Sequence, residues 1–234
     1  MIDTTDIIID KSMRLIARGL AAHRLQTITS GLENIPVEGP ALVAVRHYHH
    51  LYDGLALFAA IPRRFHILVA LDWAQNKPTK CFFETMNRLA RWPVMLRADA
   101  LVRRSDNRRN LYSPRDVLRY QRAAIRQSVD LLAQGRMLVM FPEGYPNVDP
   151  TYSPKSDPEE FLRFKSGFVK IVSAAQRRAN KTIPIIPAGF HYTRGTPWIA
   201  HLRFGAPIRS DNPRAKKDLV EQVESVVKKL SEST

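Results

Sequence analysis

A cluster of histidines at residues 47–50 offers the clearest chemistry in the chain. His47, His49 and His50 lie within four positions, and Asp53 follows them. An imidazole can act as a general base toward a hydroxyl group when a carboxylate holds its other ring nitrogen. A metal site would need further converging ligands, and no Cys or His-x-x-His pattern elsewhere supplies them, so we expect no metal. The alternative is that these are hydrogen-bonded polar side chains at a strand end with no catalytic role.

A second candidate is the sequence Phe141-Pro142-Glu143-Gly144. It ends an apolar run and begins a long polar stretch that extends to residue 160 and can form a site loop. Glycine after a strand lets backbone N–H groups approach an anion. A free carboxylate would repel that anion, so we expect Glu143 to hold an arginine or to accept from a substrate hydroxyl. The alternative is that Glu143 closes its own turn.

The chain is strongly basic, with 36 Lys and Arg residues against 22 Asp and Glu and a net charge of +14. Between Arg88 and Arg126 there are eleven arginines, three acidic residues and no lysine. The planar guanidinium group matches phosphate through paired hydrogen bonds, so this cluster favours a phosphate-bearing partner. Any single arginine in it can equally lie on the solvated face of a helix. No RNA-binding aromatic motif or zinc-finger spacing is present, and we expect no nucleic-acid partner.

The apolar runs predict the elements that position these residues. Ala41–Val45 is short, apolar and bounded by turn residues, which is typical of a buried strand, and the histidines follow its end. Ser113-Pro114 predicts the start of a helix that runs to about residue 134, and Asn212-Pro213 begins the last helix in the same way. Further strands are expected at residues 66–71, 137–141, 183–188 and 201–204. The alternation of strands and helices indicates an α/β protein.

Residues 9–26 predict an amphipathic, basic helix in which Met13, Ile16 and Leu20 share one face. Such a helix can lie in the interface of an anionic membrane or pack against the domain. No apolar run approaches the roughly 20 residues needed to span a bilayer, and the first residues lack the pattern of a secretory signal. We therefore expect one domain at residues 36–234, preceded by a helical segment at residues 1–35, on the cytosolic side of a membrane.

Together these motifs resemble those of the PlsC-like glycerolipid acyltransferases, the lysophosphatidic acid acyltransferase family. The similarity runs from about residue 39 to residue 207, and four blocks occur in the family's order. His47 falls where the family has its catalytic histidine, and Arg104, with Arg103 next, aligns with its arginine block. Phe-Pro-Glu-Gly at residues 141–144 is identical to the family's block. Phe-Lys-Ser-Gly around Lys165 resembles the start of a helix in the family. Residues 183–187 resemble the last, proline-containing block.

Two departures from the family pattern leave alternatives open. Five residues, where the family has four, separate His47 from Asp53. Either the loop holds an insertion and His47 remains the base, or His49 or His50 has taken that role. The dipeptide at residues 145–146 is Tyr-Pro where the family commonly has Thr-Arg, so one expected phosphate ligand is missing. Another arginine or Lys165 would substitute for it.

The resemblance implies a single α/β domain with a mixed central β-sheet flanked by helices. It also implies phospholipid biosynthesis by transfer of a fatty acyl group to the hydroxyl of lysophosphatidic acid or a glycerol-3-phosphate-type acceptor. The donor would be acyl-CoA or acyl-carrier protein, used as co-substrate without any further cofactor. The rival hypothesis is a catalytically inactive lipid- or membrane-binding module on the same fold.

The resemblance implies that His47 deprotonates the acceptor hydroxyl and that Asp53 orients His47. Replacing either residue by alanine is then expected to abolish transfer without affecting folding. The residues expected around the acceptor phosphate are Arg103, Arg104, Glu143, Gly144 and Lys165.

Overall fold

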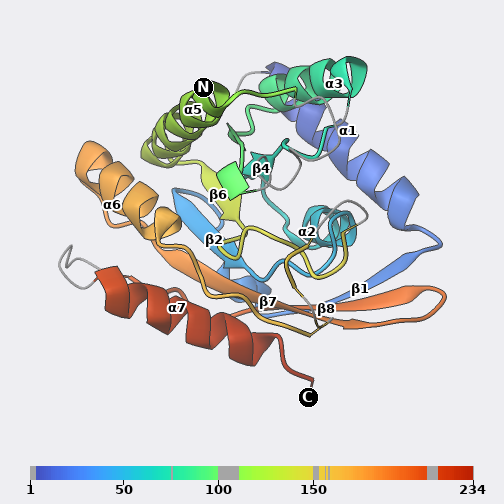
Figure 1. Cartoon of the computed structure of the whole chain (residues 1–234). Helices are drawn as coiled ribbons and strands as arrows, with labels where there is room; N and C mark the ends of the chain where they lie inside the picture. The colour runs from blue at the N-terminus through green and yellow to red at the C-terminus, as the bar shows by residue number, and fades with distance from the viewer. Residues whose placement is uncertain are drawn as a thin grey trace.

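The computed structural model describes residues 4–74, 76–99, 111–149, 153–155, 157, 159–209 and 216–233. These residues form an α/β domain around a six-stranded sheet (Figure 1). In spatial order its strands are β1 (Leu25–Ser30), β8 (Trp198–Phe204), β7 (Ile185–Thr193), β2 (Ala41–Val45), β6 (Met137–Met140) and β3 (His66–Ile67). β7 and β8 pair antiparallel, and the other neighbouring strands of this sheet pair in parallel. The expectation of a single α/β domain with a mixed sheet is confirmed.

The helices follow the capping signals in the sequence. Ser113 accepts a hydrogen bond from the Asp116 backbone N–H, and the Asp116 carboxylate accepts from the Ser113 backbone, so the predicted helix start is a reciprocal capping box. The helices are α1 (Thr4–Ala21), α2 (Tyr52–Ala60), α3 (Lys77–Leu89), α5 (Pro114–Ala133), α6 (Gly167–Ala179) and α7 (Lys216–Leu230).

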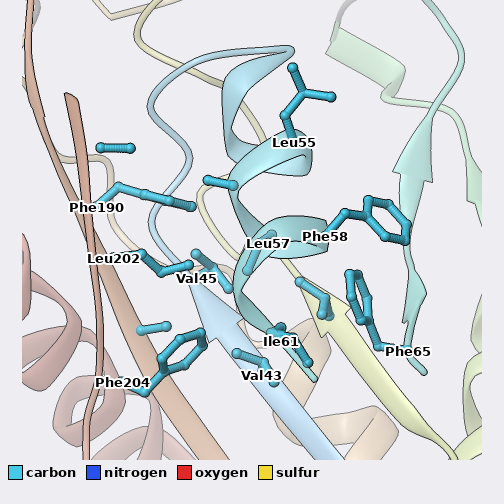
Figure 2. Packing of buried hydrophobic residues seen from close by; sticks show 14 of the residues in the cluster. Val43, Val45, Leu55, Leu57, Phe58, Ile61, Phe65, Phe190, Leu202 and Phe204 are labelled. Atoms are coloured by element: carbon cyan, nitrogen blue, oxygen red, sulfur yellow. The ribbon is translucent and has the colours of Figure 1, made fainter. Parts of the chain in front are cut away.

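Strand β2 separates two layers of apolar side chains. All five of its residues are buried, and successive side chains of a strand point to opposite faces of the sheet. Val43 and Val45 pack with residues of α2, β7 and β8, as the close view of this cluster shows (Figure 2). Leu42 and Ala44 pack on the other face, with residues of α5, α6 and α7. A strand that is apolar throughout is therefore the central element of a sheet covered on both faces.

The parallel strands bring two of the sequence motifs to one edge of the sheet. Ala44 of β2 is paired with Met140 of β6, and Val45 of β2 is paired with Ala188 of β7. Because β2 and β6 run in the same direction, the residues that follow them leave the sheet at the same edge. These are the histidine segment and the Phe-Pro-Glu-Gly turn.

The amino-terminal segment differs from its predicted form. The expected helix over residues 9–26 is observed at Thr4–Ala21, and Leu25–Ser30 form β1, which pairs in parallel with β8. The Arg14 guanidinium donates to the backbone oxygens of Phe58, Ile61 and Arg63, which ties α1 to the carboxyl end of α2. Residues 4–35 therefore contribute a strand to the central sheet as well as a docked helix.

The expected single strand at residues 66–71 is divided in two. β3 pairs with β6, whereas β4 (Val69–Ala70) pairs with β5 (Val94–Met95) in a separate two-stranded sheet. The change of partner occurs at one residue: the Leu68 N–H still donates to Val139 O, but the Val69 N–H donates to Pro93 O. An apolar run predicts an extended segment, but it cannot show where that segment leaves one sheet for another.

Candidate active site

His47 and Asp53 form a hydrogen-bonded pair at the carboxyl edge of the sheet. His47 lies two residues beyond the end of β2, and Asp53 lies in the first turn of α2. His47 Nδ1 is 2.8 Å from Asp53 Oδ2. The loop between β2 and α2 thus accommodates the additional residue without separating the two side chains.

The surroundings of Asp53 determine which ring nitrogen of His47 carries the proton. Asp53 is fully buried, and its two oxygens accept from the Tyr48 N–H, the His49 N–H and the Tyr192 hydroxyl. Burial, followed by the nearby Asp53, raises the pKa of Tyr192 well above its usual value, so the hydroxyl stays protonated and donates. A carboxylate that only accepts requires a donor at Nδ1 of His47, which leaves the Nε2 lone pair free. This tautomer, inferred from the hydrogen bonds, is the one that a general base needs.

The other two histidines are held in different ways. His49 Nδ1 accepts from the N–H groups of Leu51 and Tyr52 where α2 begins, so the proton of its neutral ring is on Nε2. Burial lowers the pKa of His49 to about 4, with the neighbouring His50 as the next cause. His50 lies at the surface, with its Nδ1 3.2 Å from Val148 O. Among the residues that the structure describes, neither side chain has a hydrogen bond to a carboxylate, which His47 has.

The Phe-Pro-Glu-Gly turn lies beneath His47. The rings of Phe141 and His47 are stacked with their centroids 4.2 Å apart. Glu143 is 1% exposed, and its Oε1 accepts from the His47 N–H at 2.9 Å. Its Oε2 accepts from the Leu162 N–H and from Lys155 Nζ. The carboxylate therefore holds a lysine where we expected an arginine, and both of its oxygens are used by donors of the protein.

Gly144 makes a tight turn whose backbone groups are already paired. Its φ of +82° is a conformation that glycine adopts without strain. Its N–H donates to Phe141 O at 3.0 Å, so the expectation of an amide free to bind an anion is corrected. A Cβ at this position would lie 3.3 Å from Lys165 Nζ, which shows how closely the lysine approaches the turn.

Arg97 joins the turn to the rest of the domain. Its guanidinium forms a buried ion pair with Asp72 at 2.7 Å and donates to Gly144 O at 2.9 Å. It also lies over the ring of Tyr145, 4.1 Å from the ring centroid. Tyr145 occupies the position where the resemblance leads us to expect a threonine, and the paired guanidinium of Arg97 fixes the carbonyl of the preceding glycine.

A cavity of about 560 Å³ connects the His47–Asp53 pair with an apolar interior. The polar residues that line it, called here the polar part of the cavity, include His47, Asp53, Arg97, Asp149 and Lys165. Apolar residues from α1, α2, α3, the two-stranded sheet and the segment between α3 and β5 also line it: Met13, Ile16, Leu20, Leu55, Phe58, Val69, Phe83, Trp92 and Met95. Ligand sites that combine an apolar wall with a few converging polar groups suit an amphipathic molecule.

Comparison with known proteins gives a family and a similar fold. The Acyltransferase family model matches residues 26–191, which is more than half of the chain. The protein belongs to the Acyltransferase family. A solved structure, the 1-acyl-sn-glycerophosphate (LPA) acyltransferase PlsC from Thermotoga maritima, has a similar fold with a TM-score of 0.59. That match has 17% sequence identity and covers 96% of this chain and 78% of the other. A comparison with curated protein sequences gives no match.

Of the basic residues expected to bind phosphate, only Lys165 is among the described residues. Lys165 is exposed at the polar part of the cavity, with its Nζ 5.5 Å from the centroid of the Tyr145 ring. Within the part of the chain that the structure describes, its ammonium forms no ion pair. Arg103 and Arg104 lie outside the described residues.

The sequence does not single out three contributors to the site of this acyltransferase. Tyr192 and Lys155 lie 139 and 108 residues from their partners Asp53 and His47. Arg97 is one of many arginines in the arginine-rich segment. A buried lysine inside a polar loop has no sequence signature, because its burial depends on the partner carboxylate.

Proposed function

We propose that this acyltransferase moves a fatty acyl group from a thioester carrier to the hydroxyl of lysophosphatidic acid or a glycerol-3-phosphate-type acceptor. The observation that carries the proposal is that the His47–Asp53 pair lines a cavity with both polar and apolar walls. The apolar wall suits an acyl chain, and the polar part suits a phosphorylated acceptor. Either acyl-CoA or acyl-carrier protein can serve as donor.

In the proposed reaction His47 Nε2 takes the proton of the acceptor hydroxyl as its oxygen attacks the thioester carbonyl carbon. Asp53 stabilises the resulting imidazolium through the hydrogen bond at Nδ1. The tetrahedral intermediate then collapses with cleavage of the carbon–sulfur bond, and the imidazolium returns its proton to the leaving thiolate. The products are an ester and a free thiol, and no acyl-enzyme is formed.

We assign the acceptor phosphate to Lys165, supported by its exposed ammonium beside Gly144 at the polar part of the cavity. Lysine offers a mobile point charge that suits phosphate. Arg104 and Arg103 remain proposed ligands. Glu143 and Gly144 would contribute indirectly, since the carboxylate is occupied and the glycine allows Lys165 to approach the turn.

Release of free thiol by the purified protein tests the proposed function. We expect release from acyl-CoA or acyl-carrier protein to depend on lysophosphatidic acid or glycerol 3-phosphate, with the acylated product seen by mass spectrometry. Parallel reactions without acceptor measure simple thioester hydrolysis. A folded protein that releases no thiol with any donor and acceptor pair would be the inactive lipid-binding module. Thiol release that is independent of acceptor would make it a thioesterase.

We further propose that the cavity receives its lipid from an anionic membrane surface. No helix among the described residues is long and apolar enough to cross a membrane. On α1, Ile8, Leu15 and Leu20 are 59%, 72% and 51% exposed, and Lys11 and Arg18 are exposed beside them. On α3, which lines the same cavity, two large apolar residues, at positions 82 and 89, are exposed as well. Burial of these apolar side chains and attraction of the basic residues to anionic lipid would then both strengthen membrane binding.

The double variant Ile8→Glu/Leu15→Glu should bind vesicles containing anionic lipid at least about 10-fold more weakly than wild type. Each buried aliphatic side chain contributes about 1.5–3 kcal/mol, and the added carboxylates repel anionic lipid. Vesicle flotation at low salt measures the effect. The matched control is Val37→Glu, since Val37 is 90% exposed and precedes β2, away from the edge that bears His47. Equal binding of both variants and wild type would show that α1 does not contact the membrane. Deleting residues 1–30 is a poor test because it also removes β1 from the sheet.

A further inference from the structure

The backbone of His47 lies beyond the last residue of β2, so its N–H and C=O need partners from outside that strand. Glu143 supplies the acceptor, with its Oε1 2.9 Å from His47 N. Lys155 supplies the donor, with its Nζ 3.1 Å from His47 O. With the Asp53 contact at Nδ1, His47 is held at both backbone polar groups and at one ring nitrogen.

The ammonium of Lys155 is fully used in contacts with protein acceptors. Its side chain is 0% exposed, and its ammonium contacts Glu143 Oε2 at 2.5 Å, Asn147 Oδ1 at 2.8 Å and His47 O. These three acceptors match the three donors of a lysine ammonium. Burial lowers the pKa of Lys155, and the adjacent Glu143 opposes that effect. Lysine is seldom buried so fully unless its charge is paired.

We propose that Lys155 is a positioning residue for acyl transfer: it fixes the peptide carbonyl of His47 and thereby the direction of the Nε2 lone pair. The proposal rests on the function proposed above. Lys155 does not touch the reacting atoms, because its ammonium is enclosed by Glu143, Asn147 and the His47 carbonyl. A small displacement of a catalytic group lowers the rate strongly, by up to about 100-fold for roughly 1 Å. Glu143 holds the N–H side of the same residue, so the two charged groups act on both sides of His47.

Three variants separate positioning from simple charge pairing. Lys155→Met removes the donor to His47 O but leaves the Glu143 carboxylate buried without its cation, so its Tm should fall. The double variant Glu143→Gln/Lys155→Met removes both charges, and the glutamine carbonyl can still accept from His47 N. The matched control is Lys181→Met, which deletes an exposed ammonium in the turn after α6.

We expect the double variant to recover most of the lost Tm but to keep kcat about 10- to 100-fold below wild type, with KM for donor and acceptor within about threefold. Lys181→Met should match wild type in kcat and Tm. If the double variant regains both Tm and kcat, Lys155 only neutralises Glu143 and the proposal is overturned. A loss confined to KM would likewise overturn it, because it would place Lys155 in substrate binding.

A second readout does not need turnover. In histidine-labelled protein, proton NMR observes the Nδ1–H that His47 donates to Asp53. We expect this signal to shift or broaden in both Lys155 variants and to stay unchanged in Lys181→Met. An unchanged signal in the double variant would refute positioning even if the wild-type protein transfers no acyl group. A perturbed signal together with an inactive wild type would refute only the proposed function.

Discussion

We expect His47→Ala to lower kcat for acyl transfer at least about 1000-fold while the protein stays folded. Positioned general bases contribute about 10²–10⁴-fold to a rate, and no other histidine in the described site has one ring nitrogen held by a carboxylate and a free lone pair on the other. The His47 side chain is 17% exposed and stacks on Phe141, and its removal leaves the buried Asp53 carboxylate with three of the four hydrogen-bond donors that the structure describes. Turnover and thermal unfolding should be measured on the same preparation.

The matched control for this variant is His50→Ala. His50 also lines the cavity, but its ring makes a hydrogen-bond contact with a backbone oxygen, that of Val148, and stacks on the His49 ring at the surface. Its replacement should change kcat by less than about tenfold, since it removes no base. If His50→Ala or His49→Ala abolishes transfer and His47→Ala does not, the base is misassigned and the extra loop residue precedes it.

Asp53→Asn should lower kcat by roughly 10⁴-fold with a smaller effect on KM. The amide can turn its NH₂ group toward His47 Nδ1, which would then have to accept, and the proton would move to Nε2. A ring protonated at Nε2 cannot remove a proton from the acceptor hydroxyl. Steady-state kinetics with both substrates varied measures the effects on kcat and KM separately.

Asp53→Ala should differ from Asp53→Asn in stability. It leaves the N–H groups of Tyr48 and His49 and the Tyr192 hydroxyl without their buried acceptor. Each unsatisfied buried group costs about 1–3 kcal/mol, so the free energy of unfolding should fall by about 3 kcal/mol or more. Folding would therefore be affected, contrary to the expectation from the sequence. Denaturant unfolding of the two variants makes the comparison, and equal stability of Asp53→Ala and wild type would mean that water replaces the carboxylate.

The sequence by itself determined the local parts of this protein. The apolar run Ala41–Val45 is a buried strand, and the Ser113-Pro114 start of α5 is a capping box, because periodicity and capping depend on neighbouring residues. The order of the motifs also indicated the family, because a motif is recognised from residue types along the chain alone. His47 and Asp53 could be named as a candidate pair because they flank one short loop.

Only the tertiary structure decided how the candidates are paired. The loop geometry brings the ring of His47, and not the ring of His49 or His50, to the Asp53 carboxylate, while the His49 ring accepts hydrogen bonds at the start of α2. Glu143 contacts His47 across 96 residues of sequence and holds Lys155 in place of the expected arginine. These contacts exist because β2 and β6 are parallel neighbours whose carboxyl ends meet at one edge. Strand order and the partners of buried charges arise from long-range packing, for which a local pattern carries no information.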